Sequence, residues 1–449
     1  MRTLVLVFAA LMLAALGASA GPPPRYFVDE AKLPFDQGPG GPSTRFWGVH
    51  NKAGYRIEVP ENWNGSLVMW AHGFRVDDPL ELTVDNHPLR DFLIANGFAW
   101  AASSYSRNMY DPAQGAKDTH ALTTFFNGKV ERPKRVYITG ASMGGHVTAV
   151  VAEQWPQYYD GALPICGVLG DYELFDYFLD FNLAAQTLSG VGQKFPFAAD
   201  YMSITVPATK VALELAPGAF PFALNTAGLN FKSLVELRSG GVRPVFEKGF
   251  LFWNGVVPGN FLFGLGVGDG TLPRQPGVAV QNSDVEYHFD TDPALTPVER
   301  AFNEDIQRIT ADRQGRRING IANVPPTTGD LRIPMLTLHT LGDLFVPFHM
   351  EQEYARRVAA HAGSHLLVQR ATRDFGHCSF TPIEFVTAFT DLVGWVEFGV
   401  QPAGDNVLDP AVVADPNYGC TFTDKSATAP RFWKQSGFEF LAPPACPTP

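Results

Sequence analysis

Short apolar runs alternate with helix-forming stretches in two separate parts of the chain. The run at 66–71 carries no charged residue, which is typical of a strand buried on both faces of a parallel sheet. Further strands are predicted at 45–51, 55–60, 98–104, 136–141, 161–168, 333–339 and 366–369, and helices at 88–96, 118–126, 143–153, 350–360 and 381–398. Strands that alternate with helices predict an α/β fold with a mostly parallel central sheet and helices on both faces.

This alternation stops between 169 and 330. Aromatic patches such as 175–178, 250–253 and 261–264 occur there instead. A stretch this long indicates an inserted, mainly helical cap rather than a structureless loop. Its clearest helix is predicted at 297–312, from the spacing of Val298, Phe302, Ile306 and Ile309. The expected division is a core at 21–168 and 331–400, a cap or lid at 169–330 and a C-terminal tail packed on the core at 401–449.

The first twenty residues have the pattern of a secretory signal peptide. Arg2 supplies a positive charge, residues 4–16 are apolar, and Ala18, Ser19 and Ala20 are small. We expect cleavage after Ala20 and a secreted or periplasmic protein. No later segment offers twenty apolar residues without a charge, so no membrane span is predicted.

Composition narrows the range of partners. The formal net charge is -11, from 34 basic and 45 acidic residues, and no basic cluster is present. This argues against nucleic acid or an anionic membrane as the main partner.

The four cysteines are an even number, which fits two disulfides in an oxidising compartment, with three possible connectivities. Proximity in sequence favours Cys420 with Cys446, which leaves Cys166 with Cys378. None of the four has the spacing of a metal site, and no metal is predicted.

The segment 136–146 reads as a strand, a Gly-x-Ser-x-Gly turn and the start of a helix. A serine at such a turn needs a strained backbone, and side chains two residues before and after it would collide unless they are glycine. Gly140 and Gly144 meet this requirement around Ser142. The N-terminus of the following helix would face a developing oxyanion.

A nucleophilic serine needs a base, and the base needs an orienting carboxylate. Asp343 follows the predicted strand at 333–339, and His377 follows the strand at 366–369. Asp171 is an alternative acid, disfavoured because its loop begins the cap. The chain order of serine, acid and histidine discriminates among serine hydrolase folds.

With these motifs the chain resembles the α/β-hydrolase superfamily over 45–168 and 332–398. The Asp-x-x-Val-Pro segment at 343–347 and the Gly-His pair at 376–377 match the acid and base loops of that family. The resemblance implies that Ser142 is the nucleophile, His377 the general base and Asp343 the orienting carboxylate. It also implies an oxyanion hole formed by the backbone N–H groups of Phe74 and Met143.

Four further residues are candidates for the edge of a substrate pocket. They are His72, Arg75, Tyr105 and His146. A structural role competes with pocket lining for each histidine: His72 would shape the oxyanion loop, and His146 would make a structural hydrogen bond one helical turn after the serine. Tyr105 is equally compatible with a position at the surface.

Cys378 directly after His377 resembles the tannase and feruloyl esterase relatives, in which a disulfide joins the base loop to a cysteine just before the nucleophile. This chain departs from that pattern, because Ala141 precedes Ser142. Polyhydroxyalkanoate depolymerases share the order of the triad. The expected function is an exported serine esterase that cleaves apolar acyl, aryl or polyester substrates, small or oligomeric, without a cofactor. Two alternatives remain: a prolyl oligopeptidase-like peptidase or amidase, and an inactive hydrolase fold that binds a ligand.

Overall fold

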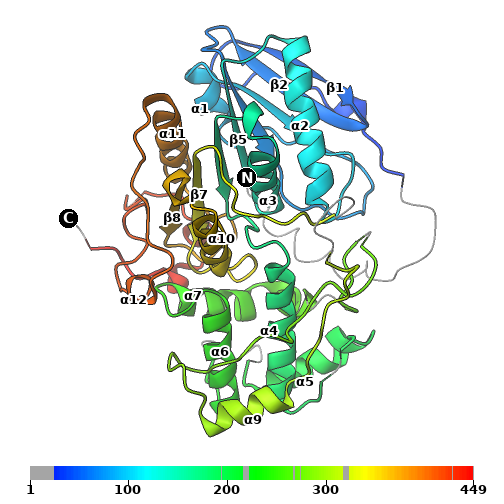
Figure 1. The fold of residues 1–449 in the computed structure, drawn as a ribbon, viewed down its shortest axis with the longest axis vertical. Coiled ribbons are helices and arrows are strands. Elements are labelled where there is room, and N and C mark those ends of the chain that lie inside the picture. Colours follow the sequence, from blue (N-terminus) through cyan, green and yellow to red (C-terminus); the bar gives the residue numbers. More distant parts are fainter. Residues whose placement is uncertain are drawn as a thin grey trace.

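A single eight-stranded sheet forms the centre of the molecule (Figure 1). The computed structural model describes residues 25–193, 195–215, 222–265, 268–273, 275–316, 323–426 and 428–447, so the predicted signal peptide lies outside the described residues. The strand order is β1-β2-β4-β3-β5-β6-β7-β8. The strands are β1 Ser43–His50, β2 Ala53–Pro60, β3 Ser66–Ala71, β4 Ala99–Ser103, β5 Arg135–Ala141, β6 Gly161–Ile165, β7 Met335–Thr340 and β8 Leu367–Thr372.

Strand pairing in the sheet is mostly parallel. Only the pairs β1–β2 and β2–β4 are antiparallel, and all pairs from β4 through β3 to β8 are parallel. The β5–β6 register sets Ala141 opposite Ile165, so the residues that follow, Ser142 and Cys166, leave the same edge of the sheet side by side. The predicted α/β class is confirmed.

Helices cover both faces of the sheet, which explains the continuous apolar strands. On one face, Leu67, Met69 and Ile138 share a buried cluster with side chains of α2, α3 and α10. On the other, Val68 and Tyr137 pack with side chains of α1 and α11. The bounds of these helices are α1 Arg90–Ala95, α2 Pro112–Lys129, α3 Met143–Gln154, α10 His349–Ala360 and α11 Pro382–Phe398.

Residues between β6 and β7 form a helical region beyond one end of the sheet (Figure 1). Its helices are α4 Glu173–Ser189, α5 Val206–Ala212, α6 Thr226–Arg238, α7 Phe246–Leu251, α8 Phe261–Gly264 and α9 Pro297–Asp305. Helix α4 is buried along most of its length because it packs against α5, α6 and α8. Among the described residues of this region the structure has no strand, only an isolated bridge between Thr271 and Val278.

The helix predicted at 297–312 is wrong in its second half. Helix α9 begins with a capping box at Thr296 and ends at Asp305, and Ile306 is extended. The chain then pairs with another segment, since Asn282 exchanges hydrogen bonds with Ile309 through its backbone N–H and its side-chain oxygen. The spacing of apolar residues predicts a helix up to residue 312, but hydrogen bonds to Asn282 hold residues after Asp305 in a non-helical conformation.

The C-terminal segment packs on the core and is held by side chains of the main fold. Arg373 donates to the carbonyl oxygens of Tyr418 and Pro444, and Arg431 pairs with the buried Glu384 of α11. Two short helices, α12 Pro410–Val413 and α13 Phe432–Gln435, lie in this segment.

Both disulfides have the connectivity that sequence proximity favoured. Cys166 is bonded to Cys378, and Cys420 to Cys446. No helix within the described part of the chain is both long and apolar enough to cross a membrane.

Candidate active site

Ser142 occupies the sharp turn between β5 and α3, with a φ of 59° and a ψ of -122°. Such a conformation is strained for any residue with a side chain. A Cβ on Gly140 would lie 2.3 Å from the carbonyl oxygen of Gly144, and one on Gly144 would lie 2.0 Å from that of Ala71. Both glycines are therefore required by close backbone contacts, as the motif predicts.

Asp343 and His377 are brought together from two neighbouring loops, after β7 and after β8. Nδ1 of His377 lies 2.6 Å from Oδ2 of Asp343. The other carboxylate oxygen, Oδ1, accepts the backbone N–H groups of Phe345 and Val346 at 2.8 and 3.1 Å. The carboxylate of Asp343 is fully buried while the imidazole is 18% exposed. This arrangement fixes the ring orientation and leaves Nε2 for chemistry.

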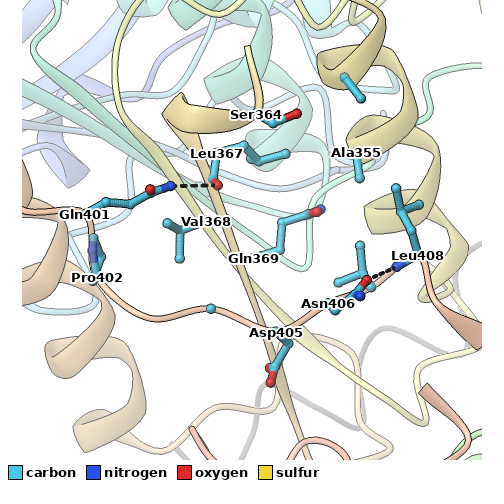
Figure 2. Close-up of a pocket in the computed structure, with 13 residues that line it drawn as sticks. Ala355, Ser364, Leu367, Val368, Gln369, Gln401, Pro402, Asp405, Asn406 and Leu408 are labelled. Atoms are coloured by element: carbon cyan, nitrogen blue, oxygen red, sulfur yellow. Dashed lines mark hydrogen bonds between the residues drawn. The ribbon is translucent and has the colours of Figure 1, made fainter. Parts of the chain in front are cut away.

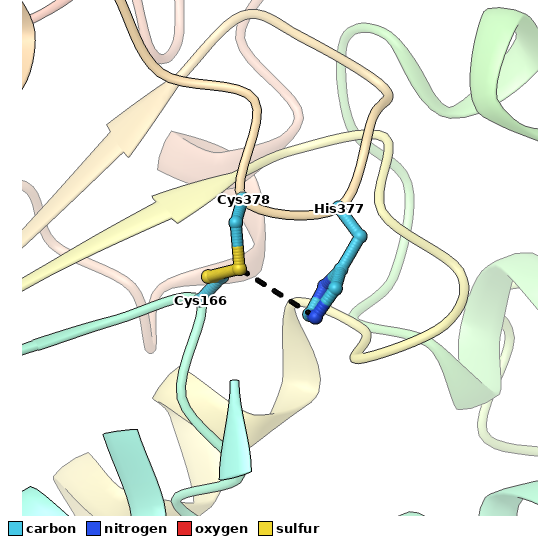
Figure 3. Close-up of side chains that lie close together, drawn as sticks. All are labelled: Cys166, His377 and Cys378. Atoms are coloured by element: carbon cyan, nitrogen blue, oxygen red, sulfur yellow. Dashed lines mark hydrogen bonds between the residues drawn. A yellow bond between two sulfur atoms is a disulfide. The ribbon is translucent and has the colours of Figure 1, made fainter. Parts of the chain in front are cut away.

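The structure does not bring Ser142 into hydrogen bonding with His377: between these two described residues no hydrogen bond is present. Nε2 of His377 instead lies 3.5 Å from Sγ of Cys378, which is part of the disulfide to Cys166 (Figure 3). The ring nitrogen and both sulfur atoms lie within 4.8 Å of one another, but the sulfurs are bonded together and neither is a thiolate. Hydrogen bonds between a nucleophile and its base are often long in structures without substrate.

The predicted oxyanion loop lies next to the serine. A Cβ on Gly73 would be 3.4 Å from Cβ of Ser142 and 3.9 Å from its Oγ, so the backbone that leads to Phe74 passes directly beside the hydroxyl. Met143 is the first residue of α3, and the first N–H groups of a helix have no partner within the helix. The two predicted donors thus come from two segments. Phe74 follows Gly73, which lies beside Ser142 in space, and Met143 follows Ser142 in the chain.

His72 and Tyr105 are buried behind this loop. Their rings stack at 3.9 Å, and the Tyr105 hydroxyl donates to the carbonyl oxygen of His72 at 3.0 Å. Nδ1 of His72 lies 2.7 Å from the carbonyl oxygen of Gly73. Burial lowers the pKa of His72 to about 3, so the ring is neutral. Both side chains shape the loop from beneath, and neither faces solvent.

His146 is also fully buried. Its two nitrogens contact the Tyr110 hydroxyl at 2.9 Å and the carbonyl oxygen of Pro325 at 2.8 Å, and burial lowers the pKa of the ring. Arg75, in the predicted oxyanion loop, forms an ion pair with the exposed carboxylate of Asp85.

The alternative acid, Asp171, lies 2.5 Å from Nη1 of Arg357 and accepts the backbone N–H of Thr327, which joins the start and the end of the helical region. Its carboxylate is thereby engaged by residues other than His377.

An aromatic cluster beside the base is the main feature that sequence reasoning missed. The ring of Phe345 lies 4.9 Å from that of His377. Phe178, Trp253 and Phe261, from the helical region, pack around Phe345 at 6.2, 6.2 and 5.0 Å. Phe345 stands two residues after Asp343 in the same loop. This short spacing is the sequence feature that could have predicted its place beside His377.

Open grooves lie elsewhere, beside the C-terminal segment. One of about 440 Å³ is bounded by α10, β8 and residues 401–408 (Figure 2). A second of about 510 Å³ shares Gly404, Asp405 and Asn406 with it. Neither is lined by the serine, the acid or the histidine, so they are not the candidate active site.

The chain is similar to several hydrolases at low sequence identity. No family model matches the chain. The o-phthalyl amidase of Xanthobacter agilis is 22% identical over 438 residues, covering 86% of this chain and 92% of that protein. Feruloyl esterase B from Aspergillus oryzae has a TM-score of 0.40 at 12% identity, with 83% and 84% of the two chains covered. An acylaminoacyl peptidase from Pyrococcus horikoshii has a TM-score of 0.37 at 10% identity, with 82% of this chain and 43% of that chain covered.

The fold itself carries the assignment. The sheet is mostly parallel with the order β1-β2-β4-β3-β5-β6-β7-β8, and a serine elbow follows β5. The acid and the histidine follow β7 and β8 and are hydrogen bonded to each other. These features are those of an α/β-hydrolase fold.

Proposed function

We propose that the protein is a serine hydrolase that cleaves carboxylic esters through an acyl-enzyme. The observation that carries the proposal is the 2.6 Å contact of Nδ1 of His377 with the buried Asp343, on the loops that follow β8 and β7. The strained Ser142 follows β5 at the same edge of the sheet. An imidazole whose Nδ1 is held by a carboxylate is suited to accept a proton at Nε2. All three groups needed for nucleophilic catalysis are thus present on one edge of the sheet.

In the proposed mechanism, Oγ of Ser142 attacks the ester carbonyl while Nε2 of His377 takes its proton. The backbone N–H groups of Phe74 and Met143 stabilise the tetrahedral oxyanion. His377 then returns the proton to the leaving alcohol, and the acyl group remains on Ser142. Water, activated by His377, attacks the acyl-enzyme and releases the acid.

The aromatic cluster supports an apolar or aryl acyl group as substrate. Phe345 packs directly on His377, and Phe178, Trp253 and Phe261 extend the apolar surface away from it. Aromatic side chains of this kind bind flat apolar groups and exclude water from the reacting atoms. Since three of the four come from 169–330, we propose that this region is a cap that supplies the acyl pocket.

Amide hydrolysis is a second candidate. It is favoured by the similarity to o-phthalyl amidase, which extends over most of both chains. The same serine, histidine and aspartate would serve both reactions, and the leaving group would decide the preference.

Export is also proposed. Two disulfides among the described cysteines support an oxidising compartment, as does the signal-like pattern at 1–20.

A matched panel of substrates tests the proposal. The panel contains p-nitrophenyl acetate, butyrate and octanoate, methyl ferulate, a soluble polyester oligomer and a phthalyl p-nitroanilide, each with the native protein and with Ser142→Ala. Ester cleavage that disappears in the variant supports the esterase. Cleavage of the anilide alone selects the amidase, and activity that persists in the variant refutes the serine mechanism.

A further inference from the structure

The helical region donates hydrogen bonds to both loops that carry the proposed acid and base. Each bond goes to a carbonyl oxygen two residues before Asp343 or His377. We propose that the cap segment 243–253 is a positioning element that holds Asp343 and His377 at their working distance, through Arg243 and Trp253. The inference rests on the proposed function, because it assigns these residues a role in the same triad.

Arg243 holds the acid loop. Its side chain is 5% exposed and Nε donates to the carbonyl oxygen of Leu341 at 2.7 Å, two residues before Asp343. Nη1 donates to the carbonyl oxygens of Gly241 and Glu236 at 2.8 and 3.4 Å, and Nη2 donates to the hydroxyl of Ser239 at 3.0 Å. Burial lowers the pKa of this guanidinium to about 10, so it remains a cation at neutral pH. Burying a charge is costly unless hydrogen bonds satisfy it, and oxygen acceptors surround this guanidinium.

The backbone of helix α7 touches the same loop. A Cβ on Gly249 would lie 2.2 Å from the carbonyl oxygen of Gly342. Only glycine permits this approach, so the cap and the residue before Asp343 are in direct backbone contact.

Trp253 holds the base loop in the same way. Its indole Nε1 donates to the carbonyl oxygen of Phe375 at 2.9 Å, two residues before His377. The neighbouring Phe252 packs on the ring of Phe375 at 4.8 Å. The indole N–H of Trp253 thus fixes the carbonyl group of Phe375, and packing against Phe252 fixes its ring.

The two loops are also joined to each other. The backbone N–H of Gly342 donates to the carbonyl oxygen of Asp374 at 2.9 Å, and that of Leu341 to Thr372 at 3.0 Å. The cap segment therefore attaches to a unit that already includes the acid and the base. Removing one of its hydrogen bonds is expected to loosen the Asp343–His377 distance while the rest of the fold persists.

The test is a double-mutant cycle measured on p-nitrophenyl acetate, whose small acyl group makes little use of the aromatic cluster. Trp253→Phe keeps a ring and removes the donor, and it should lower kcat by about 10- to 100-fold, as small misplacements of catalytic groups do. Arg243→Lys should act in the same direction. Trp433→Phe is the control, because Nε1 of Trp433 is buried without a hydrogen-bond partner among the described residues.

The second arm places each variant in an Asp343→Ala background, where no acid–base pair remains to be positioned. In that background the further decrease in kcat caused by Trp253→Phe or Arg243→Lys should be less than about 2-fold. The effects of residues that act as a unit are not additive. An undiminished loss in that background would mean a structural or substrate-binding role and would overturn the inference, as would no loss in either single variant. If Trp253→Phe fails to fold by circular dichroism, Arg243→Lys decides alone. Failure of the proposed function is separate: it would appear as full activity in Asp343→Ala and Ser142→Ala.

Discussion

Cys166 is bonded to Cys378, the residue that follows His377, so the end of β6 is covalently attached to the loop that carries His377. The backbone N–H of Ser142 donates to the carbonyl oxygen of Ile165, the residue before Cys166, at 3.1 Å. The disulfide therefore connects the loop of His377 to the end of β6, which is itself hydrogen bonded to Ser142. The cysteine bonded to the loop of His377 thus follows the neighbouring strand β6, and Ala141 stands directly before Ser142.

Removing this disulfide should affect both stability and activity. By loop-closure entropy, a crosslink with a sequence separation of 212 stabilises by about 5 kcal/mol, and one of 26 by about 3.5 kcal/mol. The double variant Cys166→Ser/Cys378→Ser should lose the larger amount in urea denaturation and should lower kcat. The matched variant Cys420→Ser/Cys446→Ser should lose stability only. Equal kcat in the two double variants would contradict a link between the first disulfide and the base.

Backbone strain at the nucleophile should be released by glycine. At a φ of 59° and a ψ of -122° Ser142 is in a region that glycine occupies without penalty. We expect Ser142→Gly to be inactive yet more stable than the native protein by about 1 to 3 kcal/mol. Ser142→Ala, which keeps the Cβ, should be equally inactive with a nearly unchanged melting temperature. A Ser142→Gly variant less stable than Ser142→Ala would argue against strain at the elbow.

Close packing makes the glycines of the elbow irreplaceable, in contrast to a glycine on the helix surface. Gly140→Ala would place a methyl group 2.3 Å from the carbonyl oxygen of Gly144 and should destabilise the protein by more than about 2 kcal/mol. Gly128→Ala is the control, since a Cβ there meets nothing within 4 Å in helix α2 and should stabilise by about 0.5 to 1 kcal/mol. Thermal unfolding of both variants measures the difference, and equal effects would contradict the packing.

Acid should destabilise the fold through buried neutral histidines. Nδ1 of His87 accepts the backbone N–H of Leu89 at 2.9 Å, and Nε2 lies 2.9 Å from the Thr139 hydroxyl. Burial lowers the pKa of His87 to about 3.

The unfolded state then binds more protons between about pH 6.5 and 3, so this contribution to stability is complete above that window and is lost as the pH falls through it. A single such group contributes a slope of up to about 1.4 kcal/mol per pH unit. Urea denaturation at several pH values should show a shallower acid loss for His87→Gln. If the native protein and His87→Gln lose stability with the same slope in acid, His87 does not gain a proton on unfolding.

The sheet and the positions of Ser142, Asp343 and His377 follow from local patterns, whereas the ends of the helices between β6 and β7 do not. Strands such as 66–71 are apolar throughout, and the glycines around Ser142 are set by backbone contacts, so both are visible in the sequence. The end of α9 at Asp305 depends on hydrogen bonds to Asn282, which no helical periodicity records.

The supporting residues of the site were hidden for a similar reason. Trp253 looked like one aromatic residue in an apolar patch, and Arg243 carried no motif. Their contacts with Phe375 and Leu341 join segments about a hundred residues apart, which only the tertiary structure brings together.

The proposed mechanism depends on Ser142 being the nucleophile that His377 activates. Its most direct test is labelling with a fluorophosphonate probe, followed by peptide mass spectrometry, on the native protein, Ser142→Ala and His377→Gln. We expect a single adduct on the peptide that contains Ser142, none in Ser142→Ala, and labelling slowed by at least about 100-fold in His377→Gln. An adduct on another residue, or unchanged labelling in His377→Gln, would contradict it.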